Sequence, residues 1–117
     1  MAYDTMENSI ASDILMTTTD SVPGKEDYEI LGVVQGSTIE TRNIGRDITQ
    51  GLRSIAGGEL PAYVEMMVKA RAVATQRMLD QARALGADAV IAMRYQTNSV
   101  AAGAAELLAY GTAVKFR

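Results

Sequence analysis

The sequence predicts an α+β domain of two layers, in which a sheet packs against one long helix. The order of the patterned segments is strand, strand, short helix, long helix, strand, strand, and this order favours an antiparallel or mixed sheet. The chain has 117 residues, of which 48% are hydrophobic and 21% charged. These values are typical of a single globular domain.

The first segment, residues 1–13, is polar and acidic and contains no hydrophobic signal core. We expect it to be a flexible N-terminal extension, followed by one domain over residues 14–117. Residues Ile14–Thr18 are predicted to form a short strand. The tripeptide Val22-Pro23-Gly24 then predicts a turn, because proline fixes φ and glycine permits a positive φ.

The tract Tyr28–Glu40 is rich in β-branched residues and predicts a longer strand. Gly32 and Gly36 lie on one face of this strand, where they permit a bulge or a close backbone approach. Strict alternation divides its apolar residues between two faces: Ile30 and Val34 on one, and Leu31, Val33 and Ile39 on the other.

Two helices are expected next. Ile48, Leu52 and Ile55 recur at helical spacing within Arg46–Ile55, and Gly57-Gly58 ends this short helix. A second helix of about 25 residues, roughly 37 Å long, is predicted from near Pro61 to a C-terminal cap at Leu85-Gly86. Its apolar residues recur at three- and four-residue spacings or their sums: Val64, Met67, Ala74, Met78 and Leu85.

The last two strands are predicted at Asp88–Thr97 and Ala104–Phe116, with a hairpin connection at Asn98–Gly103. Both strands have apolar residues on both faces: Ile91 and Met93 against Val90 and Ala92, and Leu107 and Ala113 against Leu108, Tyr110 and Val114. One long helix covers only one face of a small sheet. We therefore expect an obligate homo-oligomer whose copies bury the remaining apolar surface, with cyclic symmetry.

The composition excludes several classes of protein. The chain has no Cys and no His, which removes disulfides, thiolate chemistry, Cys/His zinc sites and the commonest general base. A net charge of -3 and a pI near 4.8 argue against nucleic-acid binding. No apolar run reaches the roughly 18 residues of a membrane span, so we expect no membrane contact. The absence of a hydrophobic signal core in residues 1–13 favours a cytoplasmic protein. We also expect no enzyme activity and no cofactor, because no His is available to activate the hydroxyl groups.

The arginines are the candidates for ligand binding. Arg42, Arg46 and Arg53 cluster in the middle of the chain, where they are candidates for contact with an anion. The favoured alternative is that they form ion pairs with acidic residues: Asp47, Glu59 or Glu65. The glycines of residues 51–58 favour a helix end over a phosphate loop, because the Lys-Ser/Thr pair of a P-loop is missing.

The remaining potential metal ligands are carboxylates, carbonyls, hydroxyls and methionine sulfur. Glu59, Asp88 and Glu106 stand alone in the sequence, as caps or salt-bridge partners usually do. The seven methionines favour core packing over a soft-metal site. We therefore expect no stoichiometric site for Zn²⁺ or Cd²⁺.

Several segments together resemble a known family. They are Thr17–Glu26, Arg46-Asp47, Gly57-Gly58-Glu59, Leu85–Val90 and Tyr110–Val114. In this order they resemble the YbjQ-like family of small bacterial proteins, and the resemblance covers Leu15 to Phe116. The resemblance implies a β-α-β-β core similar to the dodecin subunit, and a homopentameric ring.

Members of this family are often described as heavy-metal-binding domains, and some have acidic residues on the strand after the Gly-Ala-Asp turn. This chain has Arg94 and Gln96 there, so the resemblance does not extend to an acidic ion site. Our leading hypothesis is a non-catalytic, ring-forming protein with a binding or scaffolding role. The alternative is a protein that binds a small anionic ligand or a metal ion at a subunit boundary.

Overall fold

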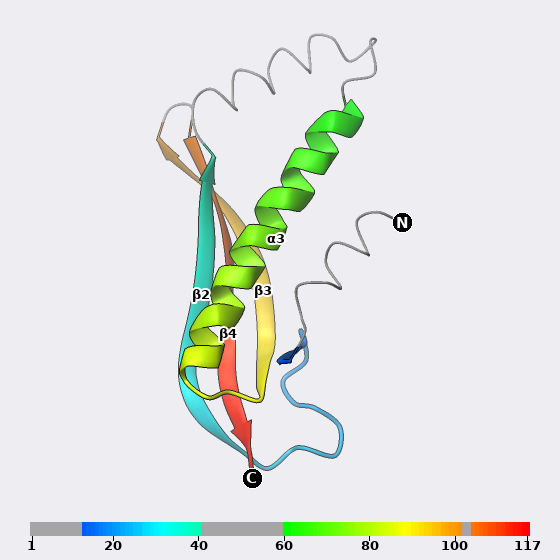
Figure 1. Ribbon diagram of the computed structural model, residues 1–117, viewed down its shortest axis with the longest axis vertical. Helices are drawn as coiled ribbons and strands as arrows, with labels where there is room; N and C mark the ends of the chain where they lie inside the picture. The colour runs from blue at the N-terminus through cyan, green and yellow to red at the C-terminus, as the bar shows by residue number, and fades with distance from the viewer. Residues whose placement is uncertain (1–12, 41–59, 102–103) are drawn as a thin grey trace.

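The computed structural model describes residues 13–40, 60–101 and 104–117 (Figure 1). It contains four strands and one helix: β1 (Leu15–Met16), β2 (Tyr28–Glu40), α3 (Leu60–Ala84), β3 (Ala89–Ala101) and β4 (Ala104–Phe116). The strands form one sheet in the order β1-β3-β4-β2. The sheet is mixed, because β1 runs parallel to β3 while the other neighbours are antiparallel. The predicted α+β class and β-α-β-β order are confirmed.

The bounds of β2 and β4 agree with those predicted from the sequence. Strand β3 is longer than predicted, because its residues from Asn98 to Ala101 continue to pair with β4. The predicted connection at Asn98–Gly103 was therefore too long. The predicted short helix Arg46–Ile55 and its stop at Gly57-Gly58 lie outside the described residues.

Helix α3 ends as the sequence predicts. Gly86 has a φ of 76°, and its N–H donates to the Arg83 carbonyl over 3.0 Å. The N–H of Ala87 reaches back to the Ala82 carbonyl over 3.0 Å. This pair of bonds is the Schellman arrangement, which satisfies two of the last carbonyl groups of the helix. Leu85 lies beyond the helix end and is 49% exposed, so it does not extend the buried stripe.

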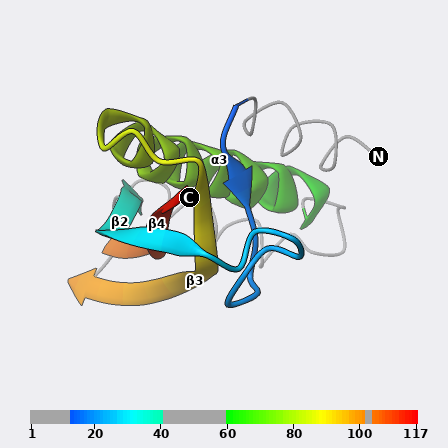
Figure 2. The ribbon, with the colours of Figure 1, turned by 90° about the horizontal axis from the view of Figure 1, so that it is seen from below.

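Helix α3 covers one face of the sheet (Figure 2). The core lies between these two layers, and all its side chains are nearly inaccessible to solvent. Its members are Ile14, Val34, Ala74, Met78, Leu79, Ala82, Val90, Met93, Ala109 and Ala113. Their burial provides the main apolar stabilisation of the described fold.

Two glycines let the backbones approach closely within this core. A Cβ atom on Gly36 of β2 would overlap backbone atoms of Ala74 and Met78 on α3. A Cβ on Gly111 of β4 would lie 2.6 Å from the Val90 side chain. The predicted close approach at Gly36 is therefore confirmed, and it places α3 directly against β2.

A bulge in β2 changes which side chains face the helix. The register shifts between Ile30 and Gly32, and Gly32 has a φ of 143°. The extra residue reverses the alternation. Leu31 therefore packs with Val34 in the core, while Ile30 is exposed like Val33 on the other side. The predicted bulge is confirmed, but the predicted assignment of these residues to faces is wrong.

A second bulge lies in β3, between Ile91 and Arg94, and Ala92 within it has a φ of 53°. Met93 consequently joins Val90 in the core under α3, whereas Ile91 packs on the opposite face. The predicted grouping of Ile91 with Met93 is wrong for the same reason as in β2. Strand β4 has no extra residue in these pairings, and its predicted faces are confirmed.

The segment between β1 and β2 covers one end of the opposite sheet face. It contains the predicted turn, in which the Lys25 N–H donates to the Val22 carbonyl over 2.9 Å and Gly24 has a φ of 79°. Val22 packs there against a small second cluster formed by Ala89, Ile91, Val114, Tyr28 and Phe116. This cluster covers the face opposite α3 only near the C-terminal end of β4 and the N-terminal end of β2.

Candidate functional site

The sheet surface opposite α3, which we call the open face, is the first candidate site. Beyond the small Val22 cluster, three large apolar side chains of β2 are exposed on it: Ile30 at 65%, Val33 at 75% and Ile39 at 57%. Leu108 and Tyr110 of β4 are half-buried on the same face. An apolar surface of this kind on a small domain is typical of an interaction site.

A solvent-open pocket of about 510 Å³ lies at the centre of β2, between side chains of α3 and β4, and we call it the edge pocket. Its lining is mostly polar and comes from β2, α3 and β4: Gln35, Gly36, Ser37, Arg77, Gln81, Glu106 and Leu108. It contains one cation and one carboxylate, together with two amides and one hydroxyl group. These groups present hydrogen-bond donors and acceptors and one charge of each sign to the solvent in the pocket.

Two side chains of α3 reach from this pocket to the backbone of β2. Arg77 Nη1 donates to the Ser37 carbonyl over 2.5 Å, and Gln81 Oε1 accepts from the Gln35 N–H over 2.9 Å. Arg77 and Gln81 are four residues apart and therefore lie on the same side of the helix. Among the residues that the structure describes, Arg77 has no carboxylate partner.

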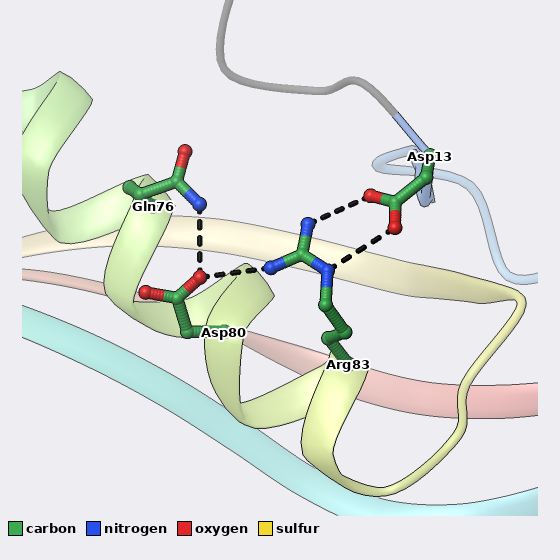
Figure 3. Close-up of polar contacts among 4 residues, drawn as sticks. All are labelled: Asp13, Gln76, Asp80 and Arg83. Atoms are coloured by element: carbon green, nitrogen blue, oxygen red, sulfur yellow. Dashed lines mark hydrogen bonds and ion pairs between the residues drawn. The ribbon is translucent and has the colours of Figure 1, made fainter.

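A chain of polar contacts joins α3 to Asp13 (Figure 3). Arg83 makes a bidentate contact with Asp13, with Nη2···Oδ1 at 2.7 Å and Nε···Oδ2 at 3.1 Å. Arg83 Nη1 also donates to Asp80, which accepts a further bond from Gln76. The hydrogen bond with Asp13 raises the pKa of the Arg83 guanidinium above its ordinary value. These exposed groups attach Asp13 to the helix, and we assign them a structural role.

The sequence analysis missed the contact between β3 and the segment after β1, which forms where Ala92 has a positive φ of 53°. The Ala92 N–H donates to the Thr19 carbonyl over 2.8 Å, and the Met93 N–H donates to the Thr17 carbonyl over 3.0 Å. Arg94 Nη1 donates to the Thr18 carbonyl over 3.0 Å. No sequence signal marks this contact, because alanine rarely adopts a positive φ.

The arginines predicted to contact an anion, Arg42, Arg46 and Arg53, lie outside the described residues. Arg77 is the cation of the edge pocket, and the sequence analysis did not single it out. The available signal was an Arg and a Gln at positions i and i+4, on either side of the buried Met78. The sequence alone did not show that a sheet edge lies beside them.

The donor groups do not fit a heavy-metal ion. The chain has no Cys and no His, and the described residues contain no group of three or more acidic side chains that could hold a metal ion. Asp88 accepts a hydrogen bond from the Phe116 N–H of β4 over 2.8 Å, which is neither a helix cap nor an ion pair. Glu106 accepts a long bond of 3.4 Å from Asn98.

No helix in the described part of the chain is long and apolar enough to cross a membrane.

The fold and these surfaces define a small α+β domain with one sheet face covered by a helix and one left open. The chain belongs to the YbjQ family described as "Putative heavy-metal-binding", which matches residues 14–117. This result confirms the resemblance found in the sequence.

The chain is also similar to several UPF0145 proteins. It is 56% identical to one from Halorubrum lacusprofundi over 102 residues, which are 87% of this chain and 98% of that protein. It is 53% identical to one from Thermus thermophilus over 103 residues, which cover 88% and 90% of the two chains. A relative from Vibrio parahaemolyticus is 51% identical over 102 residues, with 87% and 97% covered.

Among solved structures, a protein of unknown function from Pediococcus pentosaceus, of the DUF74 family, has a similar fold. The TM-score is 0.56 with 16% sequence identity, and the match covers 91% of this chain and all of that one. At this identity the likeness supports the fold alone.

Proposed function

We propose that this protein is a non-catalytic, self-assembling protein with a binding or scaffolding role, and that its copies pack through the open face. The observation that carries the proposal is the exposure of Ile30, Val33 and Ile39 on the sheet face that α3 does not cover. In water this surface is unfavourable, and burying it against another copy removes the cost.

Cyclic symmetry lets identical copies bury such a surface without leaving unmatched ends. The number five comes from the family resemblance, and we propose a pentamer on that basis. An antiparallel sheet with one solvated face usually has polar residues on that face. Strand β2 instead exposes Ile30, Val33 and Ile39 there. Apolar residues at these positions support assembly over a monomer.

The experiment measures the mass of the particle in solution by light scattering after size exclusion. We expect the wild-type mass to be a multiple of 12.5 kDa, with five copies for the pentamer. Val33→Lys places a charge on the open face and should shift the mass toward that of one subunit. Val73→Lys is the matched control, because Val73 is 41% exposed on α3, away from the open face, and should leave the mass unchanged.

A wild-type mass of one subunit at micromolar concentration would overturn the assembly. A dimer or tetramer would overturn only the pentamer. Equal loss of mass in both lysine variants would show that the interface is not confined to the open face.

A second candidate function is the binding of a small anionic ligand in the edge pocket. Arg77 supports it, because this cation lines the pocket and none of the described carboxylates pairs with it. Native mass spectrometry of freshly purified protein should then detect a reproducible extra mass per subunit. Retention of the same mass by Arg77→Gln would contradict binding at this position.

We do not propose heavy-metal binding for this chain. Soft ions prefer thiolate or imidazole ligands, and the sequence contains neither. Calorimetric titration with Zn²⁺ or Cd²⁺ should therefore show only weak binding, and one tight site per chain would reverse this conclusion.

A further inference from the structure

Strand β2 lies at one end of the sheet order, so one of its two backbone edges has no neighbouring strand in the described chain. Its other edge pairs with β4 over almost its whole length. An outer edge with free N–H and C=O groups is a template for strand addition by another chain. The groups that already bond to this outer edge therefore decide whether a strand of another chain can pair with it.

The outer edge of β2 is already bonded at its centre. The Gln35 N–H donates to Gln81 Oε1, and two residues later the Ser37 carbonyl accepts from Arg77 Nη1. A neighbouring antiparallel strand would offer the same groups, an acceptor for the N–H and a donor for the carbonyl. The two side chains of α3 thus supply the bonds that a further strand would make.

The position of α3 makes this reach possible. Gly36 lies between the two bonded residues, and its missing side chain lets the helix backbone at Ala74 and Met78 approach β2. Arg77 begins beside Gly36 and extends over the edge to Ser37. A larger residue at position 36 would push the helix, and with it both side chains, away from the edge.

We propose that Arg77 and Gln81 close the outer edge of β2 to strand addition by a second copy of this chain. The edge pocket lies over the same stretch, so there is space beside the edge that a neighbouring strand could enter if the side chains were absent. Copies consequently cannot extend the sheet through β2. This proposal does not depend on assembly through the open face.

The experiment compares Arg77→Ala/Gln81→Ala with Lys69→Ala/Gln76→Ala. The control also removes one cation and one amide from α3, but neither side chain bonds to the β2 backbone in the contacts that the structure describes. We expect the first pair of changes to increase the particle mass at least about twofold over wild type, because edge pairing joins two particles. The control should keep the wild-type mass.

Adding Gln35→Pro to the Arg77/Gln81 variant should restore the wild-type mass. Proline removes the outward N–H and blocks pairing on an edge strand while leaving the ladder with β4 intact. Failure of this rescue would show that the larger particles form elsewhere and would overturn the proposal, as would an unchanged mass in Arg77→Ala/Gln81→Ala.

A second measurement does not require the double variant to fold. Amide hydrogen exchange at Gln35 should be at least about tenfold faster in Gln81→Ala than in wild type, because the amide loses its acceptor. Gln81→Glu keeps an acceptor oxygen and should keep slow exchange. Equal exchange rates at Gln35 in wild type and Gln81→Ala would overturn the closure of the edge.

Discussion

The two faces of the sheet are both apolar, yet they differ in what covers them. On the face under α3, Val34 is 1% exposed and Ala109 and Ala113 are completely buried. On the open face, Val33 and Ile30 are 75% and 65% exposed, although they come from the same strand as Val34. Apolar residues in a strand therefore indicate burial of some kind, but they do not say whether the cover is a helix or another molecule.

The residue sizes on the two faces reflect this difference. Under α3 the sheet contributes Gly36, Ala109 and Ala113, and the missing side chain of Gly36 lets the helix lie close to β2. The open face instead has large side chains at Ile30 and other positions. Small residues are needed where α3 lies close to the sheet, because protein interiors are close-packed.

The largest effect is expected for Gly36→Ala. The added methyl group would overlap backbone atoms of α3, so the helix must move away from β2. We expect a loss of about 3 kcal/mol in the free energy of unfolding, measured by chemical denaturation. Ser37→Ala is the control on the same strand and should cost less than about 0.5 kcal/mol. A stable Gly36→Ala variant would show that α3 does not lie so close.

An intermediate effect is expected for the neighbouring pair Val34→Ala and Val33→Ala, which make the same chemical change on opposite faces. Val34→Ala leaves a cavity under α3 and should cost about 2–3 kcal/mol in unfolding free energy. Val33→Ala should cost less than about 0.5 kcal/mol, because the Val33 side chain is 75% exposed in a single chain. Equal losses would mean that the two faces are buried alike.

The smallest effect is expected for Gly32→Ala, which tests the bulge that assigns residues to the two faces. A φ of 143° is strained for any residue with a side chain, so we expect a loss of about 1–2 kcal/mol in unfolding free energy. Open space surrounds the added methyl group, so the cost is conformational and not steric overlap with other residues. Unchanged stability would show that the bulge conformation tolerates a side chain.

The sequence by itself determined the order of the four strands and the long helix that the structure describes. The β-branched content of Tyr28–Glu40 and the apolar tract Ala104–Phe116 predicted β2 and β4 with the observed bounds, and the glycine at position 86 predicted the end of α3. These features depend on interactions between residues close in the chain, so local patterns are sufficient to reveal them.

Tertiary structure alone decided which face each side chain occupies and which polar groups meet. One extra residue at Gly32, and another at Ala92, reverses the alternation, and only pairing with β4 reveals the shift. The contacts of Arg77 and Gln81 with β2 join residues that are 40 and 46 positions apart in the sequence. No local sequence pattern shows that such residues meet. Register and long-range contact are properties of the paired strands and the packed helix together, because neither segment specifies them alone.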